Sequence, residues 1–226
     1  MTYILSIETA TSVCSVAVHN DSELLGHKEL FVEKSHSALL TVLINELVAN
    51  CGISLKGLNV IAISEGPGSY TGLRIGTSTA KGLCYSLGIP LISVNTLEAM
   101  TWSVHPFLNQ GSLMCPMIDA RRMEIYCLLS NANSEVLEPT HAKIINGESF
   151  IDELEQNEIV FFGNGASKCK KTIIHTNATF IDGITPTAKN VGKIAYERYT
   201  NSEFADVAYF EPFYLKDFRP TQPKVI

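Results

Sequence analysis

The chain has 226 residues, of which 46% are hydrophobic and 18% are charged, and its formal net charge is −6. This length fits one large α/β domain or two small ones, and the apolar content excludes a disordered chain. The acidic balance argues against strong binding of nucleic acid by this chain alone, because proteins that hold a phosphate backbone usually present a basic face. The basic cluster Lys168, Lys170 and Lys171 is interpreted as the solvated face of a helix.

Membrane insertion and metal binding are not expected. No stretch reaches the roughly 18–20 apolar residues that span a bilayer, and residues 1–8 lack the basic region and long apolar core of a signal peptide. The six cysteines form no C-x-x-C pair, so we expect reduced, buried thiols. We therefore expect a soluble, cytoplasmic protein with no bound metal. The cysteines are Cys14, Cys51, Cys84, Cys115, Cys127 and Cys169.

The first half of the sequence is predicted to form strands followed by alternating helices and strands. Ser35 is a candidate N-cap and Gly52 a candidate stop for the first helix. The later strand–helix–strand order implies parallel pairing through a right-handed crossover. The predicted strands cover Tyr3–Glu8, 13–18, Glu23–Leu30, 59–64 and 91–94, and the predicted helices cover 35–50, 71–87 and 95–104.

A similar pattern restarts after a connector at 105–111. We predict two subdomains, 1–105 and 106–226, the second ending in an extended tail that contains Pro212, Pro220 and Pro223. The second half is predicted to contain a hairpin at 113–118 and 123–129, an extended stretch to 145, a helix at 147–154, a strand at Ile159–Phe162, a helix after Gly165 and a last helix at 187–199.

Four segments are distinctive: Ile7-Glu8-Thr9-Ala10-Thr11-Ser12 at the start, the glycine-rich 64–76 continuing to 83, 119–126, and the late 212–216. Together they resemble the bacterial TsaB (YeaZ) family over essentially the whole chain. The resemblance implies an α/β fold of two actin-like (ASKHA, RNase H-like) subdomains, each a mixed β-sheet flanked by helices.

The resemblance also implies a function. TsaB-like proteins are non-catalytic dimerisation subunits for making threonylcarbamoyl-adenosine beside the anticodon of tRNA, and they touch tRNA only indirectly. They pair with and activate a TsaD-like catalytic subunit and help to recruit a TsaE-like ATPase. TsaD-like chains carry a His-x-x-x-His metal pair in a segment similar to 94–100, where this chain has Thr96 and Met100. That departure predicts no catalytic metal.

The glycine-rich loops raise the question of nucleotide binding. The loop at 66–72 lies between a strand and a helix, where backbone N–H groups can hold an anion, but its spacing matches neither phosphate-loop motif. We favour structural turns here and at 163–165, and leave weak nucleotide binding, in the cleft or at the partner interface, open. The charges around 119–124 fit a solvated turn and a polar cleft mouth equally well. The candidate cleft residues are Glu8, Gly66, Gly68, Asp119, Arg121, Arg122, Gly163 and Gly165.

Two helices of the first half are candidates for a partner surface. The first has more apolar residues than one buried stripe needs and a single charge, Glu46, and the second repeats small residues at Gly72, Gly76 and Ala80. The small residues could equally pack on the chain's own sheet. We favour a four-helix layer with a partner or with a second copy, and expect Gly76→Leu to abolish pairing in a folded monomer. The nominated residues are His36, Leu39, Leu43, Leu73, Gly76, Thr77, Ala80 and Cys84.

Two alternatives belong to other functional classes. An ATP-dependent transferase or small-molecule kinase of the actin-like class would show saturable, magnesium-dependent ATP binding. A peptidase would need a nucleophile or H-E-x-x-H motif, and the sequence contains neither.

Overall fold

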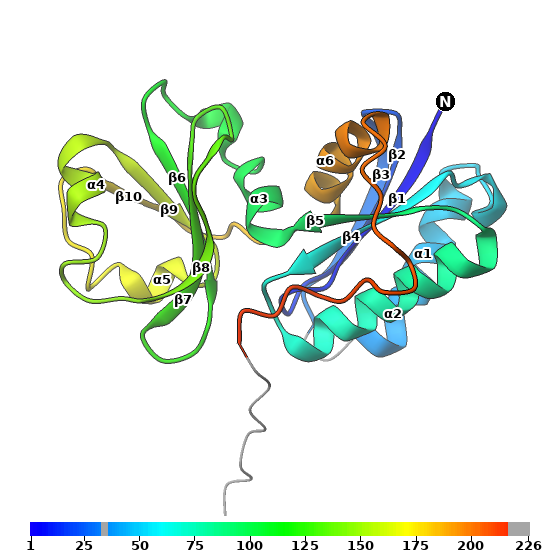
Figure 1. Ribbon diagram of the computed structural model, residues 1–226, viewed down its shortest axis with the longest axis horizontal. Coiled ribbons are helices and arrows are strands. Elements are labelled where there is room, and N and C mark those ends of the chain that lie inside the picture. The colour runs from blue at the N-terminus through cyan, green and yellow to red at the C-terminus, as the bar shows by residue number, and fades with distance from the viewer. Residues whose placement is uncertain (33–35, 217–226) are drawn as a thin grey trace, which may run out of the picture.

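The computed structural model describes residues 1–32 and 36–216, which form two lobes, each built on a five-stranded sheet (Figure 1). The strand order is β3-β2-β1-β4-β5 in the first sheet and β10-β9-β6-β7-β8 in the second. The strands are β1 (Tyr3–Glu8), β2 (Cys14–Asn20), β3 (Glu23–Leu30), β4 (Val60–Gly66), β5 (Leu91–Asn95), β6 (Leu113–Asp119), β7 (Glu124–Asn131), β8 (Val136–Ile144), β9 (Ile159–Phe162) and β10 (Ala178–Ile181).

The two sheets share one topology. In each, the first three strands pair antiparallel as a meander, and the last two add in parallel beside the first. The expectation of two mixed sheets flanked by helices is therefore confirmed. The sequence did not predict β10, a four-residue strand at the edge of the second sheet.

Helices α1 (His36–Asn50) and α2 (Tyr70–Leu87) lie side by side on one face of the first sheet. The Ser69 hydroxyl caps α2 by accepting a hydrogen bond from Gly72 N at 3.3 Å, and α2 ends at Gly88 in the left-handed conformation. The predicted cap Ser35 lies outside the described residues, as do Pro220 and Pro223 of the tail.

The other face of the first sheet is covered by α6 (Ala188–Thr200), which comes from the second half of the chain. Conversely α3 (Thr96–Thr101), from the first half, packs on the second sheet. The two helices meet between the lobes, where Asn190 Nδ2 donates to Ser103 Oγ at 2.7 Å and Arg198 pairs with Glu98 at 3.1 Å. Each sheet is therefore covered by one helix that comes from the other half of the chain.

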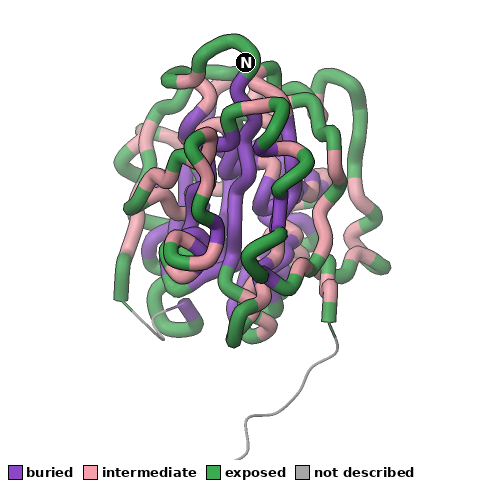
Figure 2. The backbone as a smooth tube through the Cα atoms, turned by 90° about the vertical axis from the view of Figure 1, so that its left-hand side faces the viewer, coloured by how far each residue is buried: buried purple, intermediate pink, exposed green. Residues whose placement is uncertain are grey.

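The buried strands form the centre of the fold, and short helical elements lie outside them. Figure 2 shows the buried strands running through the middle of the molecule, with exposed loops around them. No helix of the described residues is long and apolar enough to cross a bilayer. The remaining elements are α4 (Ile151–Gln156), α5 (Ala166–Cys169), η1 (Leu55–Gly57) and η2 (His105–Phe107).

Candidate functional site

A cleft of about 1420 Å³ lies between the lobes, and three parts of the chain line it. The first lobe contributes the β1–β2 turn, the start of α1 and the loop that leads into α2. The second lobe contributes the β6–β7 turn, Tyr126 and Asn164, and the chain after α6 contributes residues 213–216. The cleft therefore gathers segments that lie far apart in the sequence.

The β6–β7 turn forms the charged wall of the cleft. Arg121 and Arg122 both have positive φ angles, 69° and 48°, as a tight hairpin turn requires. Asp119 Oδ1 accepts from Arg121 N at 2.7 Å. Lys168 Nζ donates to Asp119 Oδ1 at 2.5 Å, and to the carbonyl oxygens of Arg122 at 2.7 Å and of Glu124 at 2.6 Å. This lysine was interpreted as a solvated helix residue, and that interpretation is wrong, because it holds the turn together.

The glycines named as cleft candidates serve close backbone packing. A Cβ on Gly66 would lie 2.7 Å from Phe213 O, and one on Gly68 would lie 2.7 Å from Ala10 Cβ. Gly163 packs against Met117 O, and a Cβ on Gly165 would lie 2.9 Å from the Ile118 carbonyl carbon. Of the eight candidate cleft residues, only Gly68, Asp119, Arg121 and Arg122 line the cleft.

Glu8 ends β1 beneath the cleft and is completely buried. Its Oε1 accepts a hydrogen bond from Ala10 N at 2.6 Å, while its Oε2 has no hydrogen-bond partner among the residues that the structure describes. Burial raises the pKa of this carboxyl from 4.5 to about 7, against the opposing effect of the Ala10 hydrogen bond. The carboxyl is thus largely protonated below neutral pH.

The positions that correspond to the histidine pair are core positions. Thr96 and Met100 are both fully buried, and Met100 packs with Leu97 against the second sheet. The described residues contain no group of three or more His, Cys, Asp or Glu side chains placed to hold a metal ion.

The nominated partner residues mostly face inward. Of the eight, only Leu39 is exposed. A Cβ on Gly76 would collide with Thr9 Oγ1 and lie 3.0 Å from Ile63 Cδ1, so the small side of α2 is pressed against the chain's own sheet. The expectation that this side of α2 faces another molecule is therefore wrong, and the same contacts predict that Gly76→Leu would destabilise the monomer.

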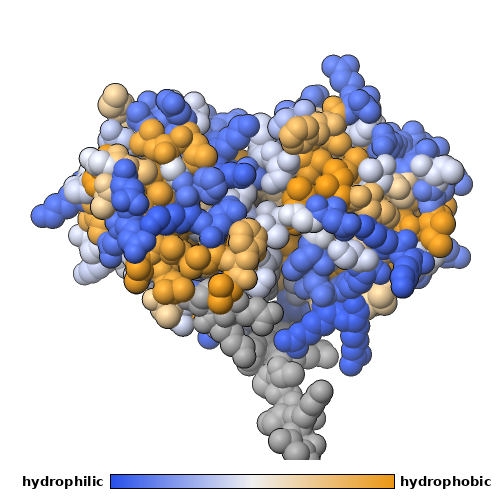
Figure 3. All heavy atoms as spheres, turned by 180° about the vertical axis from the view of Figure 1, so that it is seen from behind, coloured by the Kyte–Doolittle hydropathy of each residue, from blue (hydrophilic) through white to orange (hydrophobic). Residues whose placement is uncertain are grey.

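The opposite sides of α1 and α2 are exposed and almost uncharged. We call them the outer face, made of Ala38, Leu39, Val42 and Asn45 of α1 and Thr71, Ser78, Gly82 and Tyr85 of α2. Leu39 is 36% exposed, Val42 45% and Tyr85 87%. In the rear view of Figure 3, hydrophobic residues gather low on the first lobe, which is the left-hand one there.

Sequence reasoning missed cleft residues that come from the tail. The Tyr214 and Tyr70 rings are tilted by 38° with their centroids 5.0 Å apart, and Lys216 forms an ion pair with Glu124 of the opposite lobe. The family-like segment 212–216 was a signal, but its place in space could not be read from spacing.

The amino-acid sequence is similar to a known protein family and to named proteins of bacteria. A sequence model of the family described as TsaD, tRNA N6-adenosine threonylcarbamoyltransferase, matches residues 30–219. The tRNA threonylcarbamoyladenosine biosynthesis protein TsaB of Escherichia coli (strain K12) is 30% identical over 95% of this chain and 94% of that protein. The TsaB protein of Bacillus subtilis (strain 168) is 28% identical over 94% and 93%.

Solved structures agree on the fold. YeaZ from Pseudomonas aeruginosa superposes with a TM-score of 0.81 at 21% identity, covering 95% of this chain and 100% of that one. A second P. aeruginosa structure, described as similar to peptidase YeaZ, gives 0.84 at 20% identity, covering 96% and 100%. The match over nearly the full length of both sequence and fold leads to one conclusion: the chain belongs to the TsaB (YeaZ) family.

Proposed function

We propose that this chain is a non-catalytic subunit of the machinery that makes threonylcarbamoyladenosine in tRNA. In this proposal it pairs with a TsaD-like catalytic subunit, activates it and helps to recruit a TsaE-like ATPase. The observation that carries the proposal is the near full-length match to proteins named for this biosynthesis.

The outer face supports a pairing role. Across α1 and α2 the charged residues are Glu46, Arg74 and Lys81. Glu46 pairs with Lys28, Lys81 is bound to backbone carbonyls at the flank of α2, and the exposed Arg74 lies over the Tyr70 ring, 4.2 Å from its centre. A solvent-facing surface with so few charges has the composition of an interface core. Two helices meeting an equivalent pair would form a four-helix layer.

A second copy of the chain is a natural competitor for the same face. The small side chains Ala38, Ser78 and Gly82 present no bulk, so two such surfaces can approach closely. A symmetric pair buries the same patch on both subunits. We therefore expect a homodimer in isolation that gives way to the heterodimer when the catalytic partner is added.

The interior argues for a supporting rather than a catalytic role. A metal-dependent actin-like enzyme needs ligands at the cleft, whereas Thr96 and Met100 are buried in the core. Glu8 is buried, with its pKa raised, and does not line the cleft. A kinase or transferase would need an ionised carboxylate that reaches the metal and phosphate groups.

Reconstitution tests the proposal. The purified chain would be mixed with the TsaD-like and TsaE-like proteins of the same organism, tRNA, ATP and an activated threonylcarbamoyl donor, and modified adenosine would be measured by mass spectrometry. We expect turnover only when this chain is present and no product from this chain alone. Full turnover without it would refute the proposal.

A further inference from the structure

The segment 205–216 follows α6 and runs along the first lobe as a strap, with a turn at 207–209 (Figure 1). Ala205 N donates to Leu91 O at 2.8 Å, where the strap begins beside β5. Lys81 Nζ then donates to two strap carbonyls, those of Ala208 and Phe210, each at 3.0 Å. Lys81 therefore binds the strap to the flank of α2.

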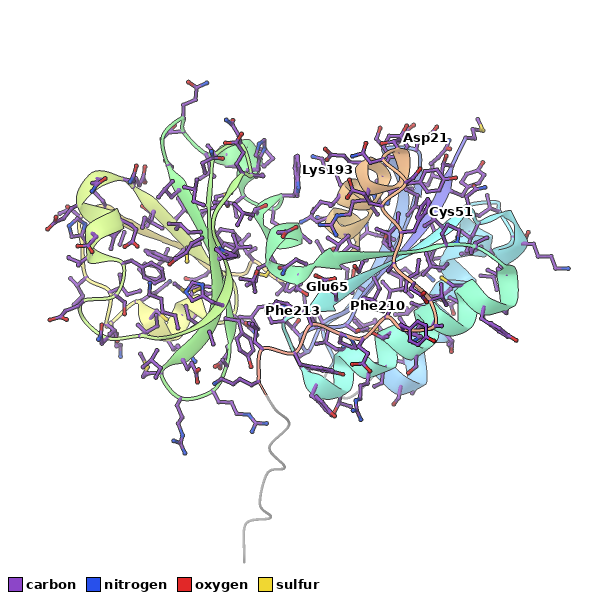
Figure 4. The ribbon with its side chains drawn as sticks, viewed as in Figure 1. Asp21, Cys51, Glu65, Lys193, Phe210 and Phe213 are labelled. Atoms are coloured by element: carbon purple, nitrogen blue, oxygen red, sulfur yellow. The ribbon has the colours of Figure 1, made fainter. Side chains whose placement is uncertain are left out.

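The strap continues toward the N-terminal end of α2. Phe213 N donates to Glu65 O at 2.7 Å, and Figure 4 shows Phe210 and Phe213 following the side of α2 toward Glu65. Phe213 O approaches Gly66 so closely that a Cβ there would lie 2.7 Å from it. The glycine that opens the glycine-rich loop thus makes room for the strap.

The end of the strap reaches the second lobe. Lys216 Nζ forms an ion pair with Glu124 Oε2 and lies 6.0 Å from the centre of the Tyr126 ring. Glu124, Tyr126 and Lys216 all line the cleft. The strap is thus bonded along the first lobe by backbone hydrogen bonds and crosses the cleft with one charged side chain.

We propose that the strap is a latch that sets the width of the cleft, with the Lys216–Glu124 ion pair as its releasable contact. An ion pair that is partly exposed is weak and is screened by salt, so the latched and released states are both accessible. The strap also grips α2. This last step rests on the proposed function: the binding of a partner to the outer face of α2 would be coupled, through the strap, to the opening of the cleft.

The test uses the isolated full-length chain, so it does not depend on any partner. Dyes would be attached through unnatural amino acids at Lys56 in the first lobe and Asn133 in the second, both exposed. Single-molecule energy transfer would then report the distance between the lobes. Hydrogen exchange at the Phe213 amide would report whether the strap stays docked on the first lobe.

Charge reversal provides the variants. We expect Lys216→Glu and Glu124→Lys each to raise the population of the wide state at least twofold, and the double variant to restore the wild-type distribution. Protection of the Phe213 amide should change less than twofold. The matched control is Lys170→Glu, which breaks an ion pair with Asp182 inside the second lobe and should leave the distribution unchanged.

The opposite results would overturn the latch. These are unchanged energy transfer in both single variants, a double variant that does not restore it, or an equal effect of the Lys170 control. If the latch fails this test, the results of the pairing and modification assays are unaffected. If those assays fail, the measured distance between the lobes is likewise unaffected.

Discussion

Gly76 in α2 packs directly against Thr9 at the end of β1, and a side chain at this glycine would collide with the threonine hydroxyl. Gly72, one turn earlier, packs in the same way against the Thr9 carbonyl. The small residues therefore bring α2 close to its own sheet. We therefore propose the other side of the helix, which carries Ser78 and Gly82, as the partner surface.

Replacing Gly76 by Ala should destabilise the monomer. Overpacking a filled core costs about 1–3 kcal/mol, which here outweighs the gain of about 1 kcal/mol in helix propensity. Urea unfolding followed by circular dichroism measures the difference in unfolding free energy. The control is Gly82→Ala, where no atom of residues 1–32 and 36–216 lies within 4 Å of the added Cβ, and it should stabilise the protein. Equal effects of the two substitutions would contradict the packing described.

The pattern of small residues was visible in the sequence, but its direction was not. Small residues repeated every four positions indicate that another element approaches one side of a helix closely, and that element can equally well be a sheet or a second helix. The choice depends on which side of α2 faces β1 and β4, which is a long-range relationship. The strands and helices themselves followed from local patterns, except β10, whose four residues carry too short a signal.

Glu8 makes stability depend on pH. Its folded pKa of about 7 lies above its unfolded value of 4.5, so the folded state binds the proton more tightly. This contribution is fully present below pH 4.5 and is lost as pH rises through 7, a change of roughly 3 kcal/mol. Glu8→Gln should remove this pH dependence. The unfolding free energy of the variant, relative to that of wild type, should therefore increase from pH 5 to pH 8. Urea titrations at both pH values check this, and a constant difference would rule out a buried, neutral Glu8.

Lys81 should hold the strap to α2. We expect Lys81→Met to keep the apolar stem and lose both hydrogen bonds to the strap, so that amides in 208–213 exchange at least threefold faster in hydrogen-exchange mass spectrometry. Lys56→Met, at an exposed position in η1, is the control and should leave these amides unchanged. Unchanged exchange in both variants would mean that the backbone contacts alone hold the strap.

Part of the cleft could be predicted and part could not. The turn at Asp119, Arg121 and Arg122 was identified because four charges around a hairpin stand out locally. Tyr214 and Lys216 were not, because their partners Tyr70 and Glu124 lie far away in the sequence and meet only after the chain has returned from α6. Contacts of that kind depend on the path of the chain rather than on local composition.

The most direct test of the pairing surface is the affinity between this chain and a TsaD-like partner, measured by isothermal titration calorimetry with Gly82→Leu. No atom of the described residues lies within 4 Å of a Cβ added at Gly82, so the leucine should leave the monomer folded, while its bulk blocks the close approach of a second helix. We predict at least a hundredfold loss of affinity, and no loss for Gly147→Leu on the second lobe, where a Cβ is equally unhindered. Wild-type affinity in the Gly82 variant would contradict the outer face as the partner surface.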